Sequence, residues 1–382
     1  MSDPNKSNRR QFLSGRAAAD ALADRLAGDD QAVFRDPIAA PYLVDFTRGA
    51  MACEFTLSLN AGQYPGVAAV ALLALDVVDQ LEDQMTVYRD TSEIAAINRR
   101  AADEPVEVEP RLFDLLMRCQ ELWRQTDGAF DITSGPLSKV WGFYRRQGGM
   151  PEADDVQRAL ALVGGDKLQL DEERCVVAFA TDGMELNLGS IGKGYALDRC
   201  AEMLEDSGVS DFLLVGSLSS VTAHGSHAVA DSAVRPGPPD GAAQTGWTVG
   251  VKDPLRPGRR LAEICLRDRA LATSGSGAQF FRYKGRRYGH ILDPRSGQPV
   301  EGVFSATAVA PSAADADALA TAFYTMGPEK TAAYCESHPD VTALLVCSGE
   351  NGGPVEVKIA GAFGDDLTMN TNASDSNPAQ EQ

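Results

Sequence analysis

Residues Pro311 to Met326 read PSAADADALATAFYTM, and this stretch decides how the fold is interpreted. Apolar residues recur along it at i, i+3, i+4 and i+7, the spacing of one buried helical face: Leu319, Ala322, Phe323 and Met326. Ser312, with Asp315 three residues later, forms a capping pair that begins a helix. Gly327-Pro328 ends it. The stretch therefore predicts an amphipathic helix.

Two polar residues of this helix, Asp317 and Thr321, fall on the face opposite the apolar one. They are one turn apart, so a carboxylate and a hydroxyl can offer two hard oxygen ligands to Mg²⁺. The alternative is that Asp317 only complements the helix dipole and that Thr321 faces water, and the stretch alone favours this alternative. Because Asp317 lies on the polar face, we expect folding not to depend on it.

The composition excludes one class of partner. The 382 residues allow two domains or one large one, and a hydrophobic share of 44% is enough for a substantial core. With 35 Lys+Arg against 54 Asp+Glu, the net charge is −19. Nucleic-acid affinity comes from clustered Lys and Arg, so we expect no nucleic-acid partner. The seven cysteines contain no CxxC pair, which excludes a zinc ribbon and favours a reducing compartment.

The chain shows no integral membrane segment. Its longest apolar run, Val67 to Leu75, is broken by Asp76 and is far shorter than the ~20 residues of a membrane span. Near the start, Arg9-Arg10 resembles a twin-arginine export signal, but charged residues interrupt the alanines that follow. We therefore read a charged amphipathic helix and expect a cytoplasmic location, with export as the alternative.

We divide the chain into a variable N-terminal arm (1–40), one main domain (41–360) and an acidic tail (361–382) that we expect to be disordered. Residues 226–246 are rich in Pro, Gly and Ala, and predict a loop insertion within the main domain. Periodicity predicts helices at 67–85, after Ser92, and at 111–125. Alternation and β-branched content predict strands at 47–60, 184–188, 212–225, 247–251, 261–266, 279–283, 305–310 and 342–347.

Three loops carry residues of chemical interest. GSIGKG, residues 189–194, places Lys193 in a glycine-rich turn at a helix start, where free N–H groups favour an anion. It is not a P-loop, because Gly194 follows the lysine. Residues 128–143, GAFDITSGPLSKVWGF, carry three aromatic residues and predict a packed, shaped loop. His290 stands beside the turn Asp293–Gly297.

Five segments in order, between Met51 and Val346, resemble one family. They are YRDTSEIAAIN, GAFDITSGPLSKVWGF, LNLGSIGKGYALD, TSGSGAQFFRYKGRRYGHILDPRSGQPV and ADALATAFYTMG. Together they resemble the bacterial FAD:protein FMN transferases, the ApbE-like flavin transferases. The resemblance implies an α+β fold of two lobes, with mixed or antiparallel sheets, packed helices and an FAD cleft between the lobes. It also implies a Mg²⁺-dependent transfer of FMN from FAD to a Thr or Ser hydroxyl of an acceptor protein, with release of AMP.

The resemblance assigns roles to residues of this chain. Metal ligands fall on Asp317, Thr321 and the backbone carbonyl of Ser190, and the proposed base falls on His290. Contacts to FAD fall on a further set: Met51, Tyr88, Ala129, Phe130, Asp131, Asn187, Lys193 and Ile291. Read without the resemblance, these residues have other interpretations. The two aromatic residues could be packing groups, the lysine a solvated side chain, and the histidine a hydrogen-bonded core residue.

The chain departs from the family pattern at three places. Asn187 stands where the family usually has Asp. Gly216-Ser217, or Leu218-Ser219 depending on the alignment, stands where it usually has two glycines, and Thr86 conservatively replaces a more usual Ser. The first removes a negative charge near the metal, and the second adds a side chain near a close-approaching ligand. Two other functions therefore stay open. One is an FAD pyrophosphatase that gives FMN and AMP, and the other is a non-catalytic FAD-binding protein.

The departure at Asn187 leads to a first prediction. We expect Asn187→Asp to raise the rate of flavin transfer or to tighten its dependence on Mg²⁺, because a carboxylate attracts the cation and an amide does not. Initial rates measured over a Mg²⁺ titration of both proteins test it. A loss of activity in the variant would show that the pocket is adapted to a neutral amide.

Overall fold

The computed structural model describes residues 42–227, 246–256, 258–275, 277, 279–349 and 353–370. The predicted arm (1–40), with Arg9-Arg10, and most of the predicted insertion lie outside the described residues. Within these ranges, no helix is both long enough and apolar enough to cross a membrane.

The centre of the protein is an eight-stranded sheet in the order β1-β2-β6-β7-β10-β15-β16-β17. Every neighbouring pair of its strands is antiparallel. The bounds are β1 Leu43–Ala50, β2 Cys53–Asn60, β6 Phe212–Gly216, β7 Ser220–His224, β10 Arg269–Gly275, β15 Val303–Ala310, β16 Thr342–Cys347 and β17 Glu356–Ala360. Three of its seven strand pairs, β1-β2, β6-β7 and β16-β17, are hairpins, and the other four are joined through longer connections.

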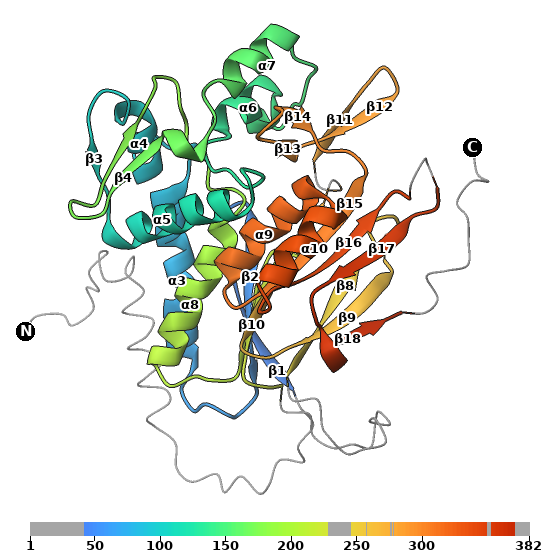
Figure 1. The fold of residues 1–382 in the computed structure, drawn as a ribbon. Helices are drawn as coiled ribbons and strands as arrows, with labels where there is room; N and C mark the ends of the chain where they lie inside the picture. The colour runs from blue at the N-terminus through green and yellow to red at the C-terminus, as the bar shows by residue number, and fades with distance from the viewer. Residues whose placement is uncertain are drawn as a thin grey trace, which may run out of the picture.

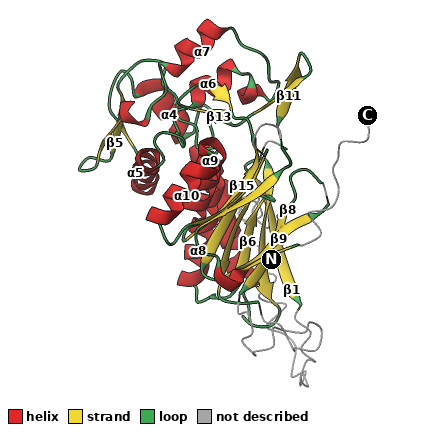
Figure 2. Cartoon of the chain, turned by 45° about the vertical axis from the view of Figure 1, so that its right-hand side comes forward, coloured by secondary structure: helices red, strands yellow, loops and turns green. Residues whose placement is uncertain are grey.

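Both faces of this sheet are covered, which gives three layers (Figure 2). Helices pack on one face: α3 Ala68–Met85, α8 Gly192–Asp206, α9 Ala313–Met326 and α10 Pro328–Ser337. A three-stranded sheet packs on the other: β8 Trp247–Lys252, β9 Arg260–Leu266 and β18 Leu367–Met369. Strand residues alternate between the two cores, because successive side chains point to opposite faces. On β10, for example, Ala270 and Ala272 face the helices, and Leu271 faces the small sheet. We call these three layers the sheet lobe.

A smaller lobe lies above the sheet lobe in Figure 1. Its helices are α4 Glu93–Arg100, α5 Pro110–Gln125, α6 Gly135–Val140 and α7 Ala153–Leu160, with 3-10 turns η1 Phe143–Arg145 and η2 Gly165–Lys167. A small sheet joins β3 Val106–Glu107, β5 Val176–Phe179 and β4 Leu168–Asp171. Two hairpins complete it: β11 Phe280–Tyr283 with β12 Arg286–Gly289, and β13 Leu292–Asp293 with β14 Gln298–Pro299. The predicted two-lobed α+β architecture is confirmed.

The deciding stretch forms the predicted helix, α9, but it is buried on nearly all sides and is not amphipathic. The Ser312 side chain accepts a hydrogen bond from the backbone N–H of Asp315 at 3.1 Å. A second cap comes from another helix, because the Asp198 carboxylate on α8 accepts from the N–H groups of Ala313 and Ala314 at 2.7 and 2.8 Å. Burial raises the pKa of Asp198 to about 7, against the opposing effect of these two amides. The start of α9 is therefore fixed to α8.

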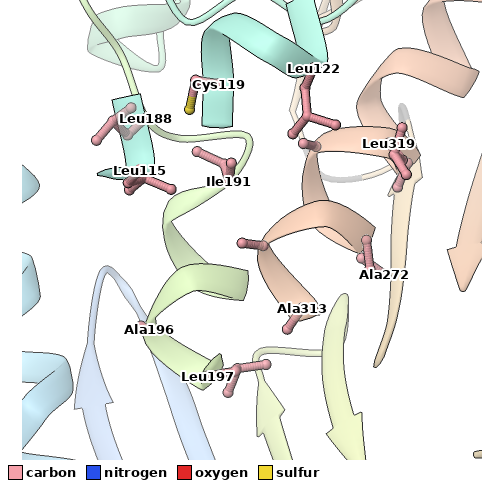
Figure 3. Packing of buried hydrophobic residues seen from close by; sticks show 14 of the residues in the cluster. Leu115, Cys119, Leu122, Leu188, Ile191, Ala196, Leu197, Ala272, Ala313 and Leu319 are labelled. Carbon is pink, nitrogen blue, oxygen red and sulfur yellow. The ribbon is translucent and has the colours of Figure 1, made fainter. Parts of the chain in front are cut away.

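Helices α8 and α9 cross at very short range. A Cβ atom placed on Gly194 would lie 2.0 Å from the carbonyl oxygen of Ala313, so only glycine allows this approach. Figure 3 shows Leu197 of α8 close to Ala313 of α9 in the main core. Because the core is close-packed, neither of these two helices can shift unless the other shifts with it.

Three other predictions from the sequence are wrong. Residues 184–188 form no strand, and only Glu185 makes an isolated bridge. The Asn98 side chain replaces a partner strand, with hydrogen bonds of 3.0 and 2.7 Å to the Leu186 carbonyl and N–H. Strand β10 was missed because its small residues give no strong β pattern. Residues 361–370 of the predicted tail are ordered, because Leu367 and Met369 of β18 pack on the small-sheet core, and residues 371–382 lie outside the described residues.

The α8–α9 contact leads to a stability prediction. We expect Gly194→Ala to lower the free energy of unfolding by about 3 kcal/mol or more, because the new methyl group meets rigid backbone. Gly192→Ala is a matched control in the same helix, since its Cβ would meet only the Met85 methyl at 3.7 Å. Urea denaturation of the two variants measures the difference. Equal stabilities would refute the role given to this crossing.

Candidate active site

A polar cavity of about 380 Å³ lies where the two lobes meet. The sheet lobe contributes the starts of α8 and β7, the end of β10 and one face of α9, and the smaller lobe contributes residues 129–138 and 290–294. The cavity brings together nine of the twelve residues that the sequence singled out: Ala129, Asp131, Asn187, Ser190, Lys193, His290, Ile291, Asp317 and Thr321. Residues more than 180 positions apart in the chain thus share one site.

Asp317 is the buried acid of this cavity, with only 6% of its surface exposed. One carboxylate oxygen, Oδ1, accepts a hydrogen bond from Ser220 Oγ at 2.7 Å, and Oδ2 accepts from the Gly194 N–H at 2.9 Å. Lys193 Nζ lies 3.3 Å from Oδ2. The expectation that folding would not depend on Asp317 is not supported, because α9 is enclosed on nearly all sides and the carboxylate holds α8 and β7 together.

Thr321 lies one turn further along α9 and lines the same cavity. Its Oγ1 is 3.0 Å from Ser274 Oγ of β10 and 3.3 Å from the Asp317 carbonyl oxygen. Ser190 lines the cavity just before α8. The part of the chain that the structure describes holds no group of three or more His, Cys, Asp or Glu that could bind a metal. A single carboxylate with hydroxyl and carbonyl oxygens fits Mg²⁺, which keeps several waters and prefers hard oxygen ligands.

The segment that leads into α8 is held by backbone contacts. The Asn187 N–H donates to the Ile132 carbonyl at 2.7 Å, and its side-chain Oδ1 accepts from the Gly189 N–H at 2.9 Å. This Asx-type turn aims residues 189–193 at the cavity. An aspartate could accept the same hydrogen bond, so the asparagine keeps the turn and removes only the charge.

His290 lines the same cavity as Asp317 and comes from the other lobe. Its Nδ1 lies 3.0 Å from the Gln279 carbonyl oxygen, and its backbone N–H donates to the same oxygen at 3.2 Å. A carbonyl can only accept, so Nδ1 carries the proton and Nε2 keeps its lone pair. Burial lowers the pKa of His290 below its ordinary value of 6.5, despite the opposing hydrogen bond. The imidazole is therefore neutral at pH 7 and available as a base.

Asp131 also lines the cavity, but both of its carboxylate oxygens already accept hydrogen bonds from other residues of the protein. Oδ1 accepts from the Thr133 N–H and hydroxyl at 2.7 and 2.6 Å, and Oδ2 accepts from the Gly165 N–H at 3.1 Å. Burial raises the pKa of Asp131, and these hydrogen bonds oppose that rise. The residue shapes the loop, and it also borders a second cavity of about 530 Å³ beside Trp123.

Three of the residues singled out do not line the cavity. Phe130 is buried in the main core. Tyr88 is 67% exposed, and its ring lies 4.9 Å from that of Tyr144. Met51 packs against the main core, and its N–H donates to Glu82 at 2.9 Å. Their contacts to FAD stay predictions.

The cavity is also lined by hydroxyl groups to which the sequence reading gave no role in the site. Five line the cavity: Ser134, Ser138, Ser219, Thr273 and Ser274. Two of them belong to the missed strand β10, although the run TSGSG stands in one of the recognised segments. At the second departure, Ser217 adopts a φ of 63° in the β6–β7 turn, a conformation that glycine adopts more readily. Ser217 itself does not line the cavity, whereas Ser219, the alternative position of this departure, does.

The fold and the cavity define an α+β protein with a polar cleft between two lobes, lined by both a neutral histidine and a buried carboxylate. The ApbE family model matches residues 51–345. The chain belongs to the ApbE family. Four comparisons support this assignment.

Two relatives are proteins named "FAD:protein FMN transferase". The one from Klebsiella pneumoniae (strain 342) is 31% identical over 284 residues, covering 73% of this chain and 82% of that protein. The one from Treponema pallidum (strain Nichols) is 33% identical over 278 residues, covering 71% and 75%.

Two solved structures are similar throughout the fold. One is the apo form of the Pseudomonas stutzeri flavinyl transferase ApbE, with a TM-score of 0.71 and 28% identity. The alignment covers 86% of this chain and 98% of that one. The other is the ApbE protein of Thermotoga maritima, with a TM-score of 0.70 and 27% identity over 83% and 97% of the two chains.

The neutral state of the His290 imidazole leads to a prediction of how kcat/KM depends on pH. Because burial lowers its pKa, the neutral form persists as the pH falls through 6.5. We expect kcat/KM to stay level through that pH and to fall only below it, where Nε2 becomes protonated. Rates from pH 5 to 8 test this, with His290→Gln as the control that should lose the acid limb. A decline that begins above pH 7 would contradict the assignment.

The position of Asp317 leads to a prediction on activity that can be measured separately from stability. We expect Asp317→Asn to lower the rate by on the order of 10²-fold or more, because the amide keeps most of the shape but not the charge. Asp315→Asn is the matched control, since Asp315 lies on the same helix but pairs with Arg118 at 2.8 Å and does not line the cavity. Activity and urea stability of both variants should be measured. Equal activity losses would argue against a special role for Asp317.

Proposed function

We propose that this protein transfers the FMN part of FAD to a Thr or Ser hydroxyl of an acceptor protein and releases AMP. The observation that carries the proposal is the pairing, in one cavity, of the unprotonated Nε2 of His290 with the buried carboxylate of Asp317. The names of the relatives give the substrate class, since the matched proteins are FAD:protein FMN transferases.

The proposed reaction forms one phosphorus–oxygen bond and breaks another. The acceptor oxygen attacks the phosphorus of the FMN phosphate within FAD, and the hydroxyl proton passes to His290 Nε2. The bond between that phosphorus and the oxygen bridging to AMP breaks, and AMP leaves with the electron pair. The hydrogen bond to Gln279 holds the imidazole in the tautomer that accepts the proton.

The other residues bind and orient the substrate. Asp317, Thr321 and the Ser190 carbonyl would hold Mg²⁺, which when bound supplies charge neutralisation on the pyrophosphate oxygens. Lys193 adds a positive charge beside Asp317, where it can pair with a phosphate oxygen of FAD. The hydroxyl groups of Ser219 and Thr273 line the same wall and can donate to phosphate oxygens.

One assay tests this function against its alternatives. The purified protein is incubated with FAD, Mg²⁺ and a candidate acceptor, and the acceptor is then examined by mass spectrometry for added FMN. Added FMN with stoichiometric AMP supports the proposal. FMN released into solution without modification of the acceptor would indicate an FAD pyrophosphatase, and intact FAD would indicate a binding protein.

The base role of His290 leads to a prediction on single turnovers. We expect His290→Ala to slow FMN transfer about 10²–10⁴-fold, because the acceptor hydroxyl loses its proton acceptor. FAD affinity should stay near that of the wild type, since the residues that would hold the phosphates are unchanged. His338→Ala is the control, because His338 stacks on Tyr334 at 4.0 Å and does not line the cavity. Lost FAD binding would refute the base role.

A further inference from the structure

The hairpin β11–β12 carries an unusual concentration of positive charge. Residues 280–289 read FFRYKGRRYG, with four cationic side chains and no acidic one, in a chain of net charge −19. Its two-residue turn, Lys284-Gly285, has φ values of 48° and 80°, the conformation of a tight hairpin turn with a fixed register. Figure 1 shows the hairpin projecting from the smaller lobe.

The base of the hairpin is anchored by aromatic rings. Phe281 and Tyr288 are paired across the two strands, and their ring centroids lie 5.2 Å apart. Each lies 6.2 Å from the ring of Trp141, at the end of α6. Trp141 donates in turn to the Gly297 carbonyl at 2.8 Å. One face of the hairpin is therefore used to fix it to the lobe.

The opposite face is exposed and basic. Arg282 and Arg287 are directly opposite each other in the register, an arrangement that is destabilising for like charges. The Arg287 guanidinium lies 3.9 Å from the ring of Phe280, which is 43% exposed. Within the described residues, Arg282 has no carboxylate at ion-pair distance. The register thus places two like charges side by side on an exposed face, where Arg282 is available to a carboxylate from outside the chain.

Further cations lie beside the hairpin. Arg145 and Arg146 are exposed at η1 and make no ion pair with any residue that the structure describes. Their segment is joined to the hairpin by Phe143, whose ring lies 5.8 Å from that of Phe281. We call Arg145, Arg146, Arg282, Lys284 and Arg287 the basic ridge.

The ridge is directly connected to the candidate base. The two residues that flank the hairpin in the chain are Gln279 and His290, which form the hydrogen bond that sets the imidazole tautomer. His290 lines the cavity. A partner held by the hairpin is therefore held next to the group that must take the proton from the acceptor hydroxyl.

We propose that the basic ridge docks an acidic segment of the acceptor protein, close to the hydroxyl that receives FMN. This inference rests on the proposed function, because it assigns a partner to the same site. Guanidinium groups bind carboxylates in pairs of charge-assisted hydrogen bonds, and the exposed Phe280 adds apolar contact. In a strongly acidic protein, a local positive surface also directs an acidic partner to this place and away from the rest of the molecule.

Two short peptides test the proposal directly. One has a single central Thr flanked by Asp residues, and its copy has Asn in place of every Asp. We expect the wild-type protein, loaded with FAD, to bind the acidic peptide about tenfold more tightly in a fluorescence anisotropy titration at low salt. The difference should shrink as salt screens the charges. Equal binding of the two peptides would overturn the proposal, and this comparison needs no variant.

A charge-reversed variant tests whether the basic ridge causes the preference for the acidic peptide. We expect Arg282→Glu to lose on the order of fivefold to tenfold in affinity for the acidic peptide and to keep its FAD affinity, because Arg282 lies outside the cavity. Lys252→Glu, an equal charge change on an exposed position of β8 in the other lobe, should have no such effect. Equal losses in both variants would show only a dependence on net charge, against the proposal.

The remaining outcomes separate docking from catalysis and from other partners. Selective binding of the acidic peptide, measured without turnover, supports docking whether or not the peptide receives FMN. Failure of FAD cleavage with every acceptor would count against the proposed function, while the peptide titration still decides the ridge. Sedimentation with vesicles that contain an anionic phospholipid should show no binding. Vesicle binding that Arg282→Glu abolishes would assign the ridge to a membrane surface and overturn the proposal.

Discussion

The contact between Gly194 of α8 and Ala313 of α9 is the constraint on which the site depends. Because no side chain intervenes, the backbone of α8 comes close enough for the Gly194 N–H to reach the carboxylate of Asp317. Ser220 on β7 supplies a second hydrogen bond, so a charge can be buried without being left unsatisfied. One close crossing thus joins two helices and a strand, and leaves an acid at the wall of the cavity.

The two halves of the chemistry come from different lobes. The sheet lobe supplies the acid, the lysine and most of the hydroxyl groups, and the smaller lobe supplies His290 through the loop between β12 and β13. Their environments also differ. Asp317 accepts hydrogen bonds from the Gly194 N–H and the Ser220 hydroxyl, whereas His290 is buried beside a carbonyl that fixes its neutral tautomer. Such a division lets one cavity hold phosphate groups on one side and accept a proton on the other.

Local sequence patterns predicted the elements that are periodic and long. Helices α3, α5 and α9 and most central strands follow from their apolar spacing, and nine of the twelve proposed site residues do line one cavity. The patterns failed where partners come from elsewhere in the chain. Residues 184–188 alternate like a strand, yet the Asn98 side chain takes the place of a neighbouring strand. Leu367 and Met369 looked like part of a polar tail, because the core that covers them is formed by distant strands.

The sequence by itself determined the family and the α+β class, because both follow from five motifs in a fixed order along the chain, and it predicted which residues belong to the site. Only the tertiary structure decided how those residues act. Burial of Asp317, the tautomer of His290 and the surface position of Tyr88 each depend on atoms far away in the chain. The basic face of the β11–β12 hairpin likewise exists only once the register places Arg282 opposite Arg287. Hydrogen-bond partners and solvent exposure are properties of the packed molecule, and no local pattern encodes them.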